Sequence, residues 1–160
     1  MTDLAPQLTQ PAAQIKQAII GHLNNLIANQ IIGSFVAVDL QKDPSKVAKN
    51  VVDWPVVLIG MDESSKNEMI TNRANQRTYK FMLLVMQRFD KLNESNEQTG
   101  MEDLKDAIIN EFDDDPTFGM TQTWIEPITA SQTATTPDDV YNMFVLTIGV
   151  NTIIDLNFAS

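Results

Sequence analysis

The sequence has no cysteine and a single histidine, His22. The missing thiols exclude disulfides, thiolate nucleophiles, zinc–thiolate sites and iron–sulfur clusters. The lone imidazole also excludes any site that needs two. The sequence has only 6 glycines, and the glycine-rich nucleotide motifs and the G-x-S-x-G motif of hydrolases are both missing. We therefore predict a protein that is not an enzyme and that uses no cofactor or metal.

The chain is also poor in basic residues and in long apolar segments. Its 21 acidic and 11 basic side chains give a formal net charge of -10, which argues against a protein that grips nucleic acid through its phosphates. No apolar run approaches the roughly 20 residues that span a bilayer. The first residues lack the basic start and apolar middle of a signal peptide. We expect a soluble, intracellular protein with no membrane partner.

The 160 residues are 43% hydrophobic, enough for one core and too few for two, so a single domain over residues 1–160 is predicted. The charge is unevenly distributed along the chain. Residues 1–80 hold 8 basic and 7 acidic side chains (+1), whereas residues 81–160 hold 3 basic and 14 acidic ones (-11). Such a chain can fold with one acidic face that lines a passage or meets a basic neighbour. The alternative is an acidic surface that only aids solubility.

The hydrophobic pattern predicts two helices and up to five strands. Apolar residues at spacings of three and four predict amphipathic helices over residues 11–32 and 101–115, and Thr99 with Glu102 fits a capping box. Alternating or β-branched apolar runs predict strands over residues 34–40, 51–60, 77–89, 121–128 and 140–156, with Gly149 as a candidate bulge in the last. This order favours an α+β fold, in which a largely antiparallel (mixed) β-sheet of four to five strands packs against two α-helices.

A polar connector separates the second predicted strand from the third. Residues 61–76 are long for a hairpin turn and have little apolar content. We therefore predict that this segment projects from the body as a flexible arm or loop.

A group of basic residues forms the first set of interface candidates. They are Lys42, Lys46, Lys49, Arg73 and Arg77. No aromatic residues are interleaved with them, so a stacking platform for single-stranded nucleic acid is not predicted. They are either solvated charges or a basic surface that docks on the acidic face of an adjacent copy.

The acidic run Asp113, Asp114 and Asp115 forms the second set of interface candidates. Adjacent carboxylates at a helix end point in different directions and the spacing of a calcium loop is missing, so no metal site is predicted. Carboxylates also oppose the dipole at a helix C-terminus, which indicates a purpose other than local stability. His22 has no companion ligand nearby in the sequence, and we predict a partly buried or surface histidine.

Several motifs follow one another in a distinctive order. The first helix is followed by WPVVLIG, the polar arm, RTYKFMLLVM, a helix ending in DDDPTFGM, a Trp-bearing strand and YNMFVLTIGV. From about Ile15 to about Leu156, this order resembles the tail terminator (tail completion) proteins of long-tailed bacteriophages. The aromatic-rich strand after the arm and the Asp-Pro-Thr-x-Gly segment at residues 115–119 carry most of the resemblance. Phe118 and Met120 depart from it, since a Leu and often a second Gly are expected there.

The resemblance implies a structural protein of the virion, at the neck end of the tail, that assembles in the cytoplasm of the bacterial host. Such proteins form a homohexameric ring that caps the tail tube protein, ends its polymerisation and meets the head–tail connector or stopper protein. Genomic DNA would pass through the ring without specific binding, and an acidic lumen would repel its phosphates. One alternative is a neck or head-completion (head–tail joining) protein. Another is a small ligand-binding α+β domain, with a carboxylate–metal site at residues 113–115.

Overall fold

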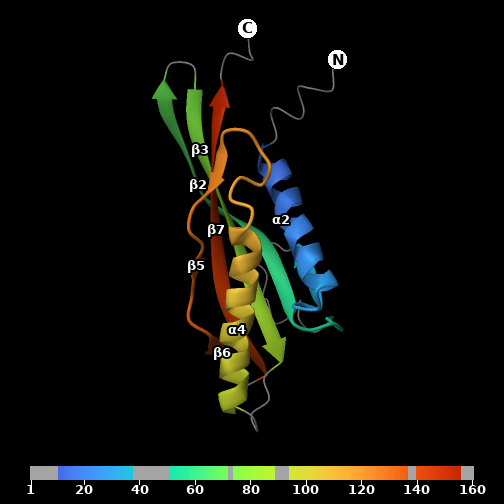
Figure 1. Cartoon of the computed structure of the whole chain (residues 1–160). Coiled ribbons are helices and arrows are strands. Elements are labelled where there is room, and N and C mark those ends of the chain that lie inside the picture. Colours follow the sequence, from blue (N-terminus) through green and yellow to red (C-terminus); the bar gives the residue numbers. More distant parts are fainter. Residues whose placement is uncertain (1–10, 38–50, 72–73, 89–93, 137–139, 156–160) are drawn as a thin grey trace.

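The computed structural model describes residues 11–37, 51–71, 74–88, 94–136 and 140–155. In this part of the chain, helix α2 spans Pro11–Ala28 and helix α4 spans Glu94–Asp113. The strands are β1 (Ser34–Ala37), β2 (Val56–Thr71), β3 (Ala74–Arg88), β4 (Thr123–Ile125), β5 (Thr129–Ala130), β6 (Ala134–Thr135) and β7 (Tyr141–Asp155). Figure 1 shows α4 in front of the long strands and α2 to their right.

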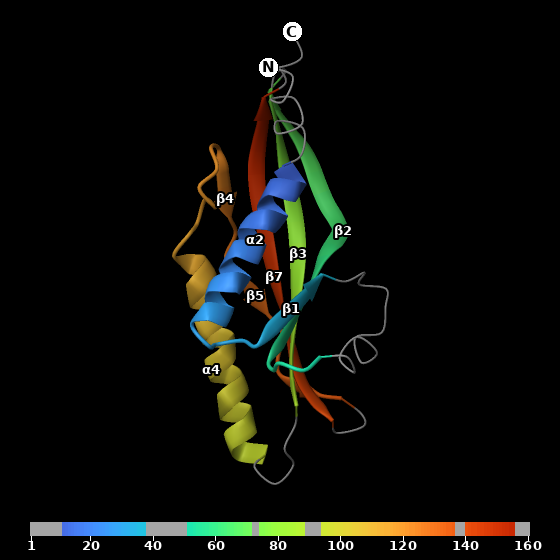
Figure 2. The same ribbon diagram turned by 90° about the vertical axis from the view of Figure 1, so that its right-hand side faces the viewer.

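The strands form one mixed sheet in the order β1-β2-β3-β7-β4, and β5 and β6 also pair with β7. β1 lies parallel to β2, and every other pairing is antiparallel. Both helices cover the same face of this sheet (Figures 1 and 2). The predicted α+β fold is therefore confirmed. The sheet has two strands beyond the five expected at most, namely β5 and β6, which are only two residues long each.

The core between the helices and the sheet follows the predicted periodicities. In α2, the residues at spacings of three and four are fully buried, namely Ile15, Ile19, Leu23 and Leu26. In β3, side chains alternate between the two faces of the sheet, and Phe81, Leu83 and Val85 pack against the helices. Met86 of β3 packs on the opposite face with Val56 and Leu58. Burial on both faces explains why β2 begins with an unbroken apolar run, because neither face of that run meets solvent.

The prediction that residues 61–76 form a flexible arm or loop is wrong. β2 continues to Thr71 and β3 begins at Ala74, so this segment forms the distal half of a paired hairpin, with register shifts between Asp62 and Lys66 and before Thr71. β7 accompanies the hairpin to its end, where Asp155 lies opposite Ala74. The three strands extend past the end of α2 (Figures 1 and 2). Backbone pairing holds these strands, and it does not require apolar side chains.

Three other details of the strands and helices differ from the sequence predictions. α4 begins at Glu94, so Thr99 lies inside the helix and the predicted capping box is wrong. The predicted strand at 121–128 is reduced to the three residues of β4, and the loop that follows contains β5 and β6. The register between β3 and β7 is unbroken, so the bulge at Gly149 is wrong. At Gly149 a Cβ would lie 2.6 Å from Oε2 of Glu126, so a larger residue would displace that side chain.

Candidate functional site

The predicted basic candidates are largely beyond the part of the chain that the structure describes. Lys42, Lys46, Lys49 and Arg73 lie outside the described residues. Arg77 is half-buried in β3, between Asn67 of β2 and Thr152 of β7. Its place in the strand puts it on the face that carries the helices, because it alternates with Tyr79 and Phe81.

The three aspartates that follow one another at the end of α4 have different environments. Asp113 is the last residue of the helix and Asp114 follows it, and both are exposed. Asp115 turns inward, and its Oδ2 lies 2.8 Å from Nε2 of His22. Within the described ranges, no group of three or more His, Asp or Glu side chains is arranged to hold a metal ion. The three carboxylates therefore form no common site.

His22 links the two helices, a role that the sequence did not reveal. Its Nδ1 lies 2.7 Å from Oε2 of Glu111, opposite the contact with Asp115. The ring packs against Phe112 and Phe118, at centroid distances of 5.0 and 5.8 Å. Both contacts can be hydrogen bonds at once only if the imidazole carries two protons, or if one carboxyl is protonated and donates to the ring nitrogen that has no proton. The side chain is 13% exposed, which confirms the predicted partly buried histidine.

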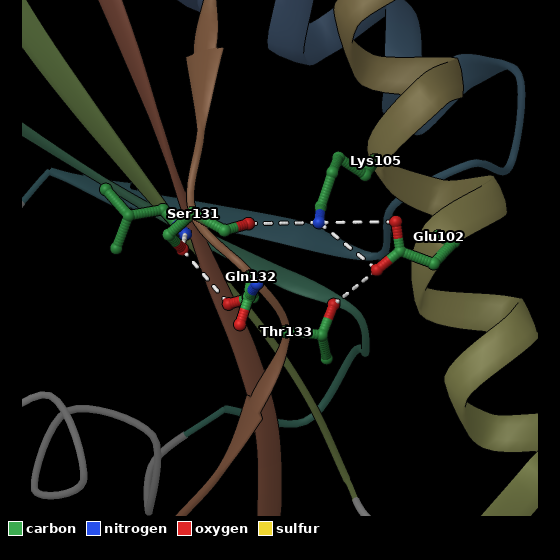
Figure 3. A network of polar contacts seen from close by, with 6 residues as sticks. Glu102, Lys105, Ser131, Gln132 and Thr133 are labelled. Carbon is green, nitrogen blue, oxygen red and sulfur yellow. Dashed lines mark hydrogen bonds and ion pairs between the residues drawn. The ribbon is translucent and has the colours of Figure 1, made fainter.

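A second polar network fastens the segment between β5 and β6 to α4. Nζ of Lys105 donates to Oε1 and Oε2 of Glu102, at 3.2 and 3.3 Å, and to the carbonyl of Ser131 at 3.0 Å. The ammonium also lies 5.1 Å from the ring centroid of Phe144. Oε1 of Glu102 accepts a further hydrogen bond from Thr133 (Figure 3). The Lys105 hydrogen bond, followed by that of Thr133, holds the pKa of Glu102 below its ordinary value of 4.5.

An aromatic cluster with an arginine lies on the sheet face that the helices leave free. The rings of Trp54 and Tyr141 stack at 5.4 Å, and the guanidinium of Arg88 lies 5.5 Å from the Trp54 ring centroid. Val52, two residues before Trp54, and Val140, which precedes Tyr141, are 86% and 42% exposed. Nε1 of Trp54 is buried and has no acceptor among the described residues. We call these five residues the Trp54 patch.

The outer face of α4 and the turn after it carry five exposed carboxylates from the acidic half of the chain. These carboxylates are those of Glu102, Asp103, Asp106 and Asp113, followed by Asp114 in the turn. Of the exposed carboxylates on this face, the structure pairs Glu102 with a cation, Lys105. The remaining four form the acidic face.

The sequence signals for these sites are partial. Lys105 is four residues from Met101 and so falls on the buried stripe, and His22 is three residues from the buried Ile19. Spacing indicates that both side chains are partly covered. It does not indicate their partners, because Glu111 is 89 residues from His22 along the chain.

Neither helix in the described ranges combines the length and apolarity that crossing a membrane requires. No family model matches the chain, and no curated protein matches it either.

Proposed function

We propose that this chain is the subunit of a tail terminator, a homohexameric ring that caps the tail tube of a long-tailed bacteriophage. The ring ends polymerisation of the tube protein and joins the tail to the head connector or stopper. Two features support this role. The elements follow one another in the order on which the resemblance rests, and the described chain folds as a sheet covered by two helices on one face.

The observation that carries the proposal is the pair of exposed carboxylates Asp103 and Asp106 on the acidic face of α4. Asp103 and Asp106 are exposed and lie on the same side of the helix as Asp113. Placed around a lumen, such side chains repel the phosphates of passing DNA. This repulsion acts over a Debye length of about 8 Å at physiological salt, so it works only at a surface close to the DNA. The DNA then passes through the ring without binding to it.

The first test is addition of the purified chain to tail tubes that are growing without it. We expect elongation to stop and a ring of six subunits to appear at one tube end, measured as tube length and by electron microscopy. Tubes that elongate as if nothing had been added would contradict the proposal. Binding to capsid connectors in place of tubes would instead identify a head-completion protein.

A second test asks whether the acidic face lines the lumen. Asp103→Asn with Asp106→Asn removes two negative charges from each subunit, and we expect assembled rings to gain affinity for duplex DNA. Asn24→Lys with Asn25→Lys makes the same change in charge at exposed positions of α2 and is the matched control. Equal DNA binding by both double variants would show that α4 has no special place beside the DNA.

A further inference from the structure

We infer that the Trp54 patch is the surface on which each subunit binds the Asp113–Asp114 turn of the next copy of this chain. The inference rests on the proposed ring and names the contact that builds it. The positive charge of Arg88 in the patch and the negative charges of Asp113 and Asp114 in the turn are complementary.

The composition of the patch is that of an energetic centre in a protein interface. Trp, Tyr and Arg dominate such centres, where they pack against a partner and exclude water. Stacking of Trp54 on Tyr141 fixes both rings, and Trp54 in turn holds the Arg88 guanidinium beside it. Three large hydrophobic residues of the described chain are exposed, and two of them lie close in sequence to these rings: Val52, two residues before Trp54, and Val140, which precedes Tyr141. The patch thus combines a fixed aromatic pair with the Arg88 cation.

The turn after α4 has the complementary charge. Four of the five residues from Glu111 to Asp115 are acidic, and they lie at the negative end of the helix dipole. His22 contacts Glu111 and Asp115. Asp113 and Asp114 are exposed and form no ion pair with a described residue. Arginine presents a planar fork of donors that matches carboxylates, so Arg88 of a neighbour would offset this charge.

The two surfaces lie on opposite faces of the sheet. α4 packs on the face that α2 also covers, whereas Trp54, Tyr141 and their apolar neighbours form the cluster on the other face. Contact between two different surfaces is heterologous and produces a ring when the rotation closes. A two-fold dimer through the patch would instead bring two Arg88 side chains together. Asp103 and Asp106 lie about 10–15 Å along the helix from Asp113, so they stay outside the contact.

The test is the native mass of the full chain over a wide concentration range. Arg88→Glu should raise the concentration at which rings form by at least about tenfold, because it replaces an attractive charge pair by a repulsive one. Asp114→Arg should weaken assembly in the same way, and the double variant, which exchanges the two charges, should assemble nearly as well as the original chain. Lys16→Glu reverses an exposed charge on α2 and is the matched control with no expected effect.

Cross-linking supplies a second measurement that does not depend on affinity. The chain has no cysteine, so Val140→Cys with Asp114→Cys introduces the only two thiols. Oxidation should join successive copies and give a ladder of up to six subunits, while Lys16→Cys with Asp114→Cys should not.

Three outcomes would overturn the inference. They are unchanged assembly of Arg88→Glu, failure of the charge exchange to restore assembly, and a chain that stays monomeric at all concentrations. In the first two cases the ring remains and another surface builds it. Arrest of tube growth is measured separately, so the proposed function stands or falls on that result.

Discussion

Nε2 of His22 lies 2.8 Å from Oδ2 of Asp115, so an imidazole from the first helix closes the C-terminal end of the second. Carboxylates are unfavourable at this end of a helix, because they lie at the negative end of its dipole. The contact therefore stabilises an acidic helix end that would otherwise be unfavourable. It also separates Asp115, which is used inside the subunit, from Asp113 and Asp114, which face outward.

We expect His22→Ala to lower the free energy of unfolding by about 1–3 kcal/mol, because Glu111 and Asp115 then remain together without their partner. Urea unfolding at neutral pH measures the change. Asn24→Ala is the control, since Asn24 is exposed on the same helix and its loss should change stability by less than about 0.5 kcal/mol. Equal stability of the two variants would show that the contact contributes nothing.

The sequence predicts those elements of the fold whose buried residues recur at regular intervals. α2 repeats its buried residues every three or four positions and β3 alternates, so their faces were identified correctly. The distal half of the hairpin was missed because a polar strand carries no apolar alternation. Its pairing is visible only in the backbone register. The extra turns of α4 and the two-residue strands likewise depend on tertiary contacts and not on local pattern.

The sites were predictable only as far as charge and composition allow. The acidic end of α4 was found from its sequence, because three consecutive aspartates are conspicuous. The Trp54 patch was not found, since Trp54, Arg88 and Tyr141 come from three separate strands or connections and meet only through sheet register. Long-range pairs of this kind have no spacing that a single sequence displays.

Lys105→Met should loosen the segment between β5 and β6 and leave the centre of the sheet unchanged. Methionine keeps the packing against Phe144 and loses the hydrogen bonds to Glu102 and Ser131, at an expected cost of about 1–2 kcal/mol. Hydrogen exchange at the Ser131 amide, which donates to Val145, should become faster. Lys16→Met is the control, because Lys16 is exposed on α2. Unchanged exchange at Ser131 would contradict the role given to Lys105.

Glu102 makes part of the stability depend on pH. The pKa of Glu102 is lowered in the folded chain by Lys105 and Thr133, so ionisation of this carboxyl favours folding. Its contribution is fully present above the ordinary pKa of 4.5 and is lost as the pH falls through the lowered value. The stability difference between the original chain and Glu102→Gln should therefore be constant near neutral pH and shrink below about pH 4.5.

Unfolding by urea between about pH 7 and pH 3 measures this difference. Thr133→Val removes the hydroxyl that donates to Glu102, so in that background the pH-dependent part should be smaller. A difference that stays the same across the whole range would mean that Glu102 titrates alike in the folded and unfolded chains.

Alanine at three glycines should give three different effects. At Gly33, a Cβ would lie 2.6 Å from the carbonyl carbon of Asp53, and backbone cannot yield cheaply, so a loss of about 2–3 kcal/mol is expected. At Gly21 a Cβ meets nothing within 4 Å, and alanine in the helix should stabilise by about 0.5–1 kcal/mol. Thermal or urea unfolding of both variants checks the order.

Gly149→Ala should lie between these two, because the obstructing atom is the end of a flexible side chain. The new Cβ would displace Oε2 of Glu126, and the carboxylate would lose the hydrogen bond that it accepts from Nδ2 of Asn151 at 3.1 Å. We expect a cost of about 1 kcal/mol. Glu126→Ala removes the same bond and the obstruction together, so adding Gly149→Ala to it should cost almost nothing more. Additive losses in the double variant would place the strain of Gly149→Ala in the backbone of β7 and not in Glu126.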